Sequence, residues 1–520
     1  VTDMDGKFTL SVQKGETLHI SYIGYVAQDV KIMGNQPVKV VMSEDTETLD
    51  EVVVVGTAMK KSDLTGAVAS VSSKVLEEKP VTNVNQALQG RVAGVFISQP
   101  TRPTDDASIK IRGINTINGS TDPIYVVDGM VMDNSFSGFN AVNLNDVASI
   151  EVLKDASATA LYGSRGSNGV VLVSTKQGKS GKAKVAFNAS FGVQTLEKKM
   201  DVLNATEWME FKLRWNDANY LQEAKKLGLT SASIKDDNAT RLSNLGIQAG
   251  TANSYLVVFD ERWFNYLGDD MRNAHTYTPN PEQLSLLDWQ DEFFRNSIVQ
   301  DYSLNVSGGT ENTSYLFSGG YMNQAGIVTG TGYERFSFRA NIESKINKYL
   351  TIGMNMAPTY IVQDGSGQAN GKDSQVHQAL YATPVSEPGV GYMTNVDPNP
   401  YYLWAGSTSS PVYNMEKNIK QNRMMRLVGN AFVRITPFKD FRVELSASAN
   451  YYDLDGNDYK YTSTTGSWAQ GEGQNSSGGH NTERKWSTLL QALANYDHVF
   501  GNHGISVMAG FSSEQSNLGF

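Results

Sequence analysis

The amino-acid sequence predicts a mainly β protein: a small β-sandwich, an α/β unit, and part of a large antiparallel transmembrane β-barrel. Three observations lead to this fold class. Long segments from residue 184 onward alternate between apolar and polar residues, the connections between them alternate between short and long, and a compact segment with mixed helix and strand patterns precedes them. Alternation with a period of two is typical of strands with one apolar face.

Composition excludes several classes of protein. The chain has 520 residues, no cysteine and a net charge of −10 at pH 7. The missing cysteines exclude disulfides, thiolate metal sites and cysteine nucleophiles, and the acidic balance argues against nucleic-acid binding. The longest apolar runs, such as residues 255–259, fall far short of the roughly 18 residues that a membrane-spanning helix needs. A β-barrel is compatible with this composition, because its strands are short and only half apolar.

Residues 1–42 predict the small β-sandwich. Apolar and polar residues alternate over 8–12, 18–22 and 38–42, between segments typical of turns. The segment Asp-Met-Asp-Gly at 3–6 predicts a hairpin turn rather than a calcium loop, because no further oxygen ligands follow it. Strand-like sequence begins at once without a secretory signal, so we expect the natural N-terminus to lie further upstream.

Residues 43–56 join an acidic stretch to four consecutive valines. One interpretation is a linker that leads into a buried strand. The other is a segment that adds as a strand to the exposed sheet edge of a partner, where backbone hydrogen bonds supply the affinity. Composition favours the linker, but the order of segments in the rest of the chain favours partner binding. The residues that would bind are Asp50, Glu51, Val52, Val53, Val54 and Val55.

Residues 57–178 predict a compact α/β unit. The patterns predict a helix over 83–90, strands at 92–97, 108–113, 123–129, 149–153 and 170–173, a helix over 155–161, and a glycine-rich turn over 163–169. This turn is not a phosphate cradle, because it leads from a helix to a strand and lacks the Gly-Lys-Ser/Thr ending.

Residues 184–520 predict the first portion of the barrel. Alternation is clearest over 185–193, 336–342, 441–451 and 505–511, and about nine strands can be counted. Long strands that are apolar on one side and polar on the other match a wall between lipid and water.

The connections between these strands predict the same asymmetry. Short turns lie near 309–312, 347–348, 437–440 and 501–503, whereas long polar loops occupy 196–298, 362–421 and 455–482, with a shorter one near 326–333. Short turns at one end and long loops at the other are typical of a membrane barrel, and weaken the alternative of a soluble β-sandwich. Because such barrels are closed and have even strand numbers, we expect a longer barrel.

These motifs, in this order, resemble the SusC/RagA family of TonB-dependent outer-membrane transporters. The segment Leu-Asp-Glu-Val-Val-Val-Val-Gly at 49–56 is similar to the TonB-box region. Ile-Arg-Gly at 111–113, Pro-Ile-Tyr-Val-Val-Asp-Gly at 123–129 and Glu-Val-Leu-Lys-Asp-Ala-Ser at 151–157 are similar to plug signatures. The segment 161–170 is similar to the plug-ending motif, and 288–291, 307–309, 324–327 and 333–336 fit early barrel strands.

The resemblance implies the organisation and the partners. Residues 1–42 would be a carboxypeptidase-regulatory-like domain, 43–56 a linker with the TonB box, 57–178 a plug, and 184–520 the barrel. The family imports oligosaccharides or peptides through the outer membrane, with a SusD-like surface lipoprotein as a lid and with energy from TonB. We therefore expect outer-membrane lipid around the barrel and no cofactor.

Aromatic residues in the predicted outer loops are candidates for substrate binding, because aromatic rings stack well on sugars, although they also pack in loop cores. These candidates are Trp263, Tyr401, Tyr402, Trp404 and Trp468. Trp289 lies beside the start of a strand, and we interpret it as structural.

Evidence for a metal or a catalytic site is weak. Asp453, Asp455, Asn457 and Asp458 place oxygen ligands in a predicted loop, but a solvated turn is the favoured interpretation over a calcium site. The six histidines lack metal-binding spacing, and no nucleophile elbow is present. The sequence predicts a non-enzyme. Import of oligosaccharides is the leading hypothesis, and import of oligopeptides or a surface receptor that binds without transport are the alternatives.

Overall fold

The structure is a computed structural model of the 520-residue chain. It describes residues 15–22, 25–32, 34, 40, 52–55, 57–60, 68–73, 84–98, 107–114, 116, 121–132, 142–249, 251, 253–258, 285–365, 375–386, 418–460, 476–500 and 503–519.

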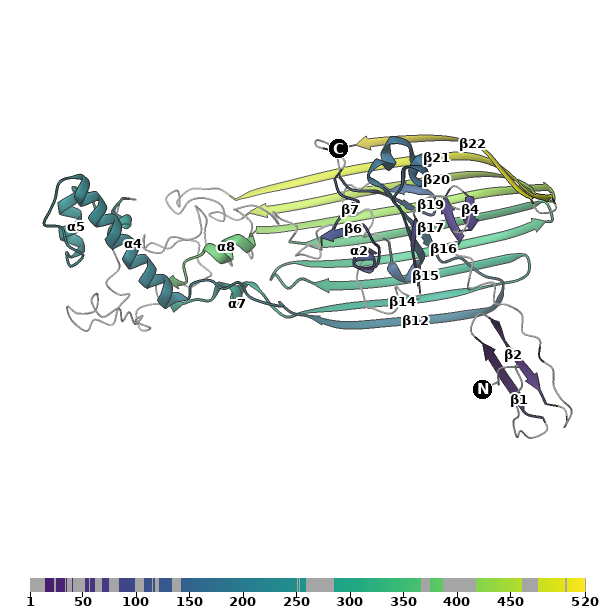
Figure 1. Ribbon diagram of the computed structural model, residues 1–520, viewed down its shortest axis with the longest axis horizontal. Coiled ribbons are helices and arrows are strands. Elements are labelled where there is room, and N and C mark those ends of the chain that lie inside the picture. The colour runs from purple at the N-terminus through teal and green to yellow at the C-terminus, as the bar shows by residue number, and fades with distance from the viewer. Residues whose placement is uncertain are drawn as a thin grey trace.

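A nine-stranded antiparallel sheet, here called the wall, dominates the molecule (Figure 1). Neighbouring strands follow one another along the chain, and their number agrees with the predicted one. The strands are β12 (Gly181–Gln194), β14 (Ser297–Gly309), β15 (Thr313–Ala325), β16 (Gly332–Asn347), β17 (Leu350–Asp364), β19 (Asn418–Phe438), β20 (Phe441–Lys460), β21 (Ser477–Phe500) and β22 (His503–Gly519).

The connections between wall strands confirm the predicted asymmetry. Two or three residues join β14 to β15, β16 to β17, β19 to β20 and β21 to β22, whereas long segments join strands at the other end. One predicted boundary was wrong. The loop expected over 455–482 is shorter, because β20 and β21 stay paired as far as Lys460 and Ser477.

The two faces of the wall differ as the alternation predicted. On β16, Phe336 and Phe338 are 47% and 45% exposed on the outer face. The flanking residues Arg335 and Arg339, which point to the inner face, are each only 3% exposed. An apolar outer face and a polar inner face are what a strand between hydrocarbon and water needs.

Aromatic side chains mark two levels on the outer face. Near the long-loop end, Tyr321 contacts Phe336 with ring centroids 4.9 Å apart, and Tyr451 is paired with Trp486 on the neighbouring strands. Near the short-turn end, Phe438 stacks on Phe441. Phe441 and Tyr451 are about ten residues apart on β20, which is the length that a tilted strand needs to cross the hydrocarbon of a membrane.

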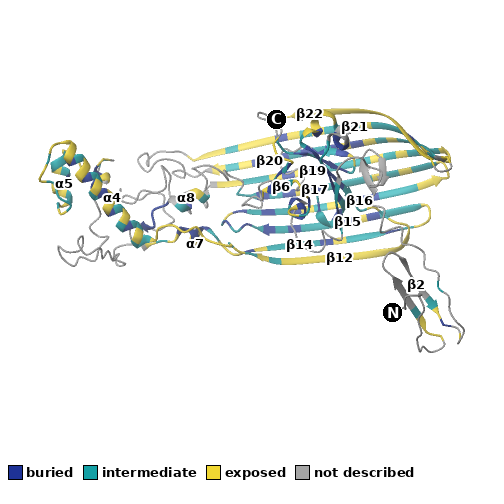
Figure 2. Cartoon of the chain, in the orientation of Figure 1, coloured by how far each residue is buried: buried dark blue, intermediate teal, exposed yellow. Residues whose placement is uncertain are grey.

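The edge strands of the wall are paired on one side only. Within the described part of the chain, β12 pairs only with β14 and β22 only with β21, and both strands are almost fully exposed (Figure 2). Unpaired backbone groups are too costly in lipid, so a wall of this kind needs further strands to close in a membrane.

The α/β unit lies against one face of the wall (Figure 1). Its main sheet has the order β5-β10-β11-β8-β9, in which only β8 and β11 are parallel. A second pair, β6 with β7, forms a hairpin. The elements are β5 (Val68–Ser72), α2 (Val84–Leu88), β6 (Val95–Ser98), β7 (Ser108–Ile111), β8 (Ile124–Val127), β9 (Met130–Met132), η2 (Leu144–Asp146), β10 (Val147–Leu153), α3 (Ala156–Thr159), η3 (Ala160–Asn168) and β11 (Val170–Thr175).

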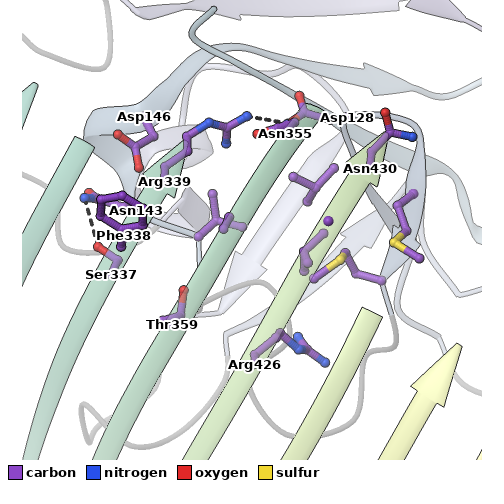
Figure 3. Close-up of a pocket in the computed structure, with 17 residues that line it drawn as sticks. Asp128, Asn143, Asp146, Ser337, Phe338, Arg339, Asn355, Thr359, Arg426 and Asn430 are labelled. Carbon is purple, nitrogen blue, oxygen red and sulfur yellow. Dashed lines mark hydrogen bonds and ion pairs between the residues drawn. The ribbon is translucent and has the colours of Figure 1, made fainter. Parts of the chain in front are cut away.

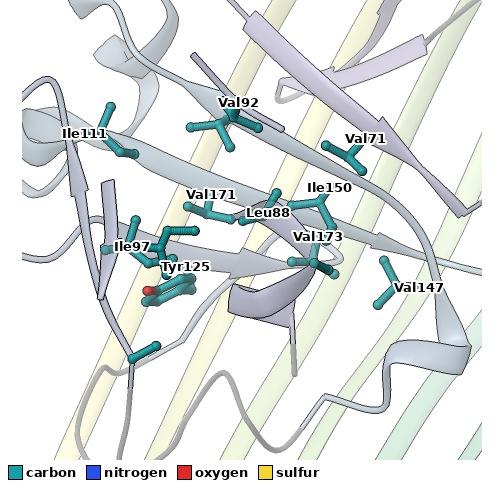
Figure 4. Close-up of a cluster of buried hydrophobic side chains, with 14 of the residues drawn as sticks. Val71, Leu88, Val92, Ile97, Ile111, Tyr125, Val147, Ile150, Val171 and Val173 are labelled. Atoms are coloured by element: carbon teal, nitrogen blue, oxygen red, sulfur yellow. The ribbon is translucent and has the colours of Figure 1, made fainter. Parts of the chain in front are cut away.

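One apolar cluster holds the α/β unit together (Figure 4). Leu88 of α2, Ile109 of β7, Ile150 of β10 and Val171 of β11 are fully buried against one another. Burial of each such side chain contributes about 1.5–3 kcal/mol as an upper bound. The helix, the hairpin and the main sheet are therefore one body.

Two details of the α/β unit differ from the prediction. Residues 163–169, expected to be a turn, mostly continue the 3-10 helix η3, which is kinked at Gly163. Strand β11 extends two residues beyond the predicted end and finishes at Thr175. A Cβ atom on Gly178 would lie 2.5 Å from the backbone of Tyr315, so Gly178 lets the chain pass closely over the wall.

Two hairpins precede the α/β unit. Strand β1 (Thr17–Tyr22) pairs with β2 (Tyr25–Lys31), and β3 (Val52–Val55) pairs with β4 (Thr57–Lys60). Strand β1 agrees with the strand predicted over 18–22, whereas β2 was not predicted. Of the other predicted strands, 8–12 and nearly all of 38–42 lie outside the described residues.

The connection between β12 and β14 contains helices that the sequence analysis treated as loop. Helices α4 (Ala205–Lys226) and α5 (Asn238–Leu245) lie beyond the long-loop end of the wall (Figure 1). Arg241 is 0% exposed there and donates hydrogen bonds to the carbonyl oxygens of Asp236 and Val257, while it pairs with Asp217. These contacts fix α5 against α4.

Short elements complete this end of the molecule: η4 (Ser254–Leu256), β13 (Ser285–Leu286), α7 (Trp289–Phe293), α8 (Gln375–Tyr381) and β18 (Val385–Ser386). Trp289 is 3% exposed, and its indole nitrogen donates to the carbonyl oxygen of Thr383 at 2.8 Å, which confirms its structural role. Within the described ranges, no helix is both long enough and apolar enough to cross a membrane.

Candidate functional site: the contact between the α/β unit and the wall

The α/β unit meets the inner face of the wall through buried polar side chains (Figure 3). On the side of the unit, they come from the turn between β8 and β9, from η2 and from the end of β11. On the side of the wall, they come from β16, β17 and β19. We call this region the interface.

Asp128 is the centre of the interface. Its Oδ2 atom accepts hydrogen bonds from Arg339 Nη2 at 2.7 Å and from Asn355 Nδ2 at 2.7 Å, both on the wall. Within the α/β unit, it also accepts one from the hydroxyl of Thr175 at 2.6 Å. Asp128 adopts a left-handed backbone conformation with φ of 48°, which the short polar side chain of an aspartate tolerates in a tight turn.

The Asp128–Arg339 ion pair is shielded from water. The side chains of Arg339 and Asp128 are 4% and 22% exposed, and Arg339 also donates to the hydroxyl of Thr175. Removal of one member of such a pair leaves an uncompensated buried charge, which costs about 3–5 kcal/mol. This pair therefore couples the position of the α/β unit to the wall.

Asn143 forms a second contact. Its Oδ1 accepts from the backbone N–H of Asn145 and so caps η2, while its Nδ2 donates to Ser337 Oγ at 3.2 Å. A Cβ atom on Gly320 would lie 2.4 Å from the same amide nitrogen and 2.7 Å from the Ser337 hydroxyl. The approach of η2 to the wall therefore depends on a glycine at position 320.

Asp146 is a buried carboxyl beside this contact. Burial raises its pKa above the ordinary value, although the nearby Ser318 side chain and the charges of Arg339, Arg335 and Lys176 act in the opposite direction. Arg335 also donates to the carbonyl oxygen of Val142 at 3.2 Å. The protonation state of Asp146 is therefore linked to the docking of η2.

A cavity of about 50 Å³ lies within the interface, lined by residues that include Asp128, Asp146, Arg339 and Asn355. This is room for one or two water molecules, at about 30 Å³ each. Arg339 Nε and Asn355 Oδ1 have no protein partner within the described structure, so water can bond to them. A polar interface with room for water can separate by exchanging hydrogen bonds, without exposing an apolar core.

Further contacts lie around the rim of the α/β unit. The backbone N–H of Gly178 donates to Asn341 Oδ1 of β16 at 3.2 Å. On the opposite side, Arg165 of η3 pairs with Glu514 of β22 at 2.8 Å, and both side chains are partly exposed. An exposed pair of this kind contributes about 0–1 kcal/mol, so the buried contacts on β15, β16 and β17 dominate.

The structure places only part of the sequence-predicted site. Val52, Val53, Val54 and Val55 form β3, which is paired with β4. Asp50, Glu51 and the aromatic candidates Trp263, Tyr401, Tyr402, Trp404 and Trp468 lie outside the described residues.

The loop predicted around residues 453–458 is wrong, because these residues belong to β20. Asp453 accepts a hydrogen bond from Arg484 at 3.0 Å, and Asp455 accepts one from Asn457 at 2.6 Å. Asp458 follows Asn457 directly on the strand and so points to the opposite face. No group of three or more histidine and carboxylate side chains that could hold a metal ion is present in the described part of the chain.

Sequence reasoning missed the residues of the interface. Asp128 lies in the segment 123–129, whose pattern assigns no role to this residue, and Arg339 is one of the polar residues in the alternating segment 336–342. The sequence does place a long cationic side chain, Arg339, on the inner face of a predicted strand. Periodicity cannot identify its partner Asp128, which is more than two hundred residues away in the chain.

Comparisons with known proteins place this architecture. A model of the TonB-dependent Receptor Plug Domain matches residues 60–170, and a model of the CarboxypepD_reg-like domain matches residues 1–54. The TonB-dependent receptor P26 of Formosa agariphila is 30% identical over 99% of this chain and 46% of its own length. The TonB-dependent receptor SusC of Bacteroides thetaiotaomicron is 34% identical over 66% of this chain and 29% of its own length.

Solved structures show the same relationship. The RagAB peptide importer in its open-open state superimposes with a TM-score of 0.64 and 25% identity, over 90% of this chain and 50% of that one. In its closed-closed state the TM-score is 0.63 and the identity 26%. The chain thus spans about half or less of the proteins it matches.

An α/β unit docked on the inner face of a two-faced wall defines a plugged receptor of the TonB-dependent class. Within that class, the chain belongs to the SusC/RagA-like TonB-dependent receptors. Its relatives are receptors and importers rather than enzymes. From here on, the α/β unit is called the plug.

Proposed function

We propose that this chain is part of a TonB-dependent importer that carries oligosaccharides through the outer membrane. Its segments would act as a regulatory-like domain (1–42), a linker with the TonB box (43–56), a plug (57–178) and a barrel wall (184–520). The observation that carries the proposal is the polar interface around Asp128 and Arg339, which holds the plug firmly but can exchange its hydrogen bonds with water.

Residues 50–55 would transmit the force. TonB would bind this segment by strand addition, in which backbone hydrogen bonds supply the affinity. Strand β3 pairs with β4 in this structure, so TonB either displaces β4 or adds to the other edge of β3. A pull on this segment reaches β5 as the first strand of the main plug sheet, and among the described strands β5 is an edge strand that pairs with β10 alone.

The cargo would enter from the long-loop end with the help of a SusD-like surface lipoprotein. Trp263, Tyr401, Tyr402, Trp404 and Trp468 would stack on sugar rings. Import of oligopeptides is the second candidate, favoured by the likeness to the RagAB peptide importer. A receptor that binds without transporting is disfavoured, because it would need neither a TonB box nor a plug.

Deletion of residues 51–55 tests the transport mechanism. We expect uptake of labelled oligosaccharides by cells to fall to background, while binding of the same oligosaccharides at the cell surface stays unchanged. A matched deletion of five residues in the acidic stretch, 43–47, should keep uptake, because it leaves the valines in place. Normal uptake after the 51–55 deletion would refute the proposed role.

The class of cargo requires a separate experiment. Cells carrying Trp404→Ala or Trp468→Ala should bind oligosaccharides more weakly by about tenfold, the loss expected for a stacked aromatic ring. If peptides compete for uptake and oligosaccharides do not, the second candidate replaces the first.

A further inference from the structure

The outer face of the wall contains a shallow hollow of about 700 Å³, on the side of β15, β16 and β17 opposite to the plug interface. Gly319 forms its floor, between Leu304 of β14 and Phe338 of β16 in the strand register. A Cβ atom on Gly319 would meet nothing within 4 Å. The missing side chain leaves space that the neighbouring side chains do not fill.

The lining of the hollow is apolar and rigid. Phe187, Leu304, Phe336, Phe338 and Met425 present exposed apolar surface around it, and Pro358 stiffens one side. The volume falls within the range of about 300–1,000 Å³ that is usual for small-molecule sites. In a wall that faces hydrocarbon, the molecule available to fill such a space is the acyl chain of a lipid.

The hollow reaches the aromatic level near the long-loop end, because Tyr302, Tyr321 and Phe336 are among its lining residues. Tyr302 and Tyr321 stack with their ring planes 8° apart, and Tyr321 contacts Phe336. The phenol of Tyr321 reaches Glu334, which stands one same-face position higher on β16. Aromatic residues of this kind sit at the level of lipid headgroups, so a chain in the hollow would belong to the leaflet on the long-loop side.

Arg423 stands at this headgroup level. It is two residues from Met425 on β19, so both side chains point to the outer face about 7 Å apart. Arg423 is exposed and donates to the side chain of Gln421 at 2.9 Å. Asp455 lies opposite it on β20, but among the described residues no ion pair joins Arg423 to Asp455, which accepts a hydrogen bond from Asn457. A guanidinium with several remaining donors suits a phosphate.

We propose that the hollow and Arg423 form a binding site for one anionic membrane lipid, with an acyl chain over Gly319 and a phosphate on Arg423. Charge and shape together define the ligand. The hollow gives affinity for hydrocarbon, and the guanidinium selects an anionic headgroup over a zwitterionic one. The site would fix one lipid on the wall beside the plug contacts of β15 and β16.

Native mass spectrometry of the receptor purified in detergent from its own outer membrane tests the acyl part. We expect the wild type to retain one phosphate-bearing lipid, and Gly319→Leu to retain it about tenfold less, since burial of one leucine-sized side chain changes affinity by at least that factor. Ala431→Leu, on the outer face of β19 away from the hollow, should retain it fully. Leu304→Trp fills the same hollow from the neighbouring strand and provides a second variant.

Reconstitution tests the headgroup part. Vesicles of phosphatidylcholine with a trace of labelled phosphatidylglycerol, and separately of lipopolysaccharide, would be compared by lipid retention after detergent extraction. Arg423→Gln should remove the preference for the anionic lipid, whereas Arg484→Gln, whose arginine is paired with Asp453, should keep it. The arm with the higher retention identifies the source of the phosphate.

Two results would overturn the proposal. The first is equal lipid retention by the wild type, Gly319→Leu and Leu304→Trp. The second is a change of oligomeric state in these variants without a change in lipid retention, which would assign the hollow to a second copy of the chain. Neither result bears on transport, so the proposed function is tested independently.

Discussion

Gly320 of the wall and Asn143 of the plug come so close that a Cβ atom on the glycine would lie 2.4 Å from the asparagine amide nitrogen. Its neighbour Gly319 faces the opposite side of the sheet, where a Cβ atom meets nothing within 4 Å. The two adjacent glycines therefore lie on opposite faces of β15, Gly320 towards the plug and Gly319 towards the outer face.

We expect Gly320→Ala to weaken the docking of the plug by about 1–3 kcal/mol, the usual cost of overpacking a tight contact. Gly319→Ala should leave docking unchanged. Hydrogen exchange of the η2 amides, followed by mass spectrometry, measures the difference. Equal protection in both variants would show that the plug does not approach the wall as described.

Loss of the cation at position 339 should release the plug. Arg339→Leu leaves the carboxylate of Asp128 without its charged partner, at an expected cost of about 3–5 kcal/mol. The turn between β8 and β9 should then exchange hydrogen faster, and the plug should unfold at lower urea concentration. Arg434→Leu is the control, because Arg434 pairs with Glu343 and Glu444 within the wall. If both variants behave alike, Arg339 is not a specific link.

The buried carboxyl of Asp146 predicts a pH dependence. Its pKa is raised by burial above the ordinary value of 3.8, so the folded plug holds this proton at pH values where the unfolded chain has lost it. The contribution of Asp146 to stability is therefore most favourable below pH 3.8, and it is lost as the pH rises through the raised pKa.

Asp146→Asn should remove this dependence, because the amide cannot ionise. We expect the variant to gain stability relative to the wild type as the pH rises from acid to neutral, measured by urea unfolding of the plug. A stability difference that stays constant with pH would contradict the assignment. Glu514→Gln, at the exposed pair with Arg165, serves as a comparison for a solvated carboxylate.

The packing of α5 against α4, which together form a helical lobe beyond the long-loop end of the wall, depends on Arg241. Arg241→Met should destabilise this lobe by about 3–5 kcal/mol, because the fully buried guanidinium pairs with Asp217 and satisfies backbone carbonyls. Limited proteolysis between residues 227 and 258 should become faster, while the wall stays intact. Arg214→Met removes an exposed pair with Glu210 and should have no comparable effect.

The wall could be predicted from the sequence because its signal is local. Phe336 and Phe338 alternate with Ser337 and Arg339, and this two-residue period marks a strand with one apolar and one polar face. The extent of β20 was misjudged, because Asp453 and Asp455 look like loop residues. On this part of β20 Asp453 and Asp455 lie on one face, whereas Tyr452 and Leu454 on the other face are each 2% exposed, so charged residues do not mark the end of the strand.

The interface could not be predicted, because its partners are distant in sequence. Asp128 and Arg339 are joined only by the docking of two separately folded units, and no periodic pattern records that docking. The helices α4 and α5 were missed for another reason. Asn204 and Glu207 form a capping box at the start of α4. This local signal predicts a helix start, but it lies within the long polar segment that was interpreted as a loop.

The strands β20 and β21 run well past Tyr451 and Trp486, as far as Lys460 and Ser477. Nine residues beyond the aromatic level add about 30 Å of strand, or about 20 Å of height at the usual tilt. The ends of β20 and β21 thus form a rim that extends beyond the level of the lipid headgroups. For the proposed importer, a bulky, hydrated cargo would enter within this rim before it reaches the depth of the bilayer.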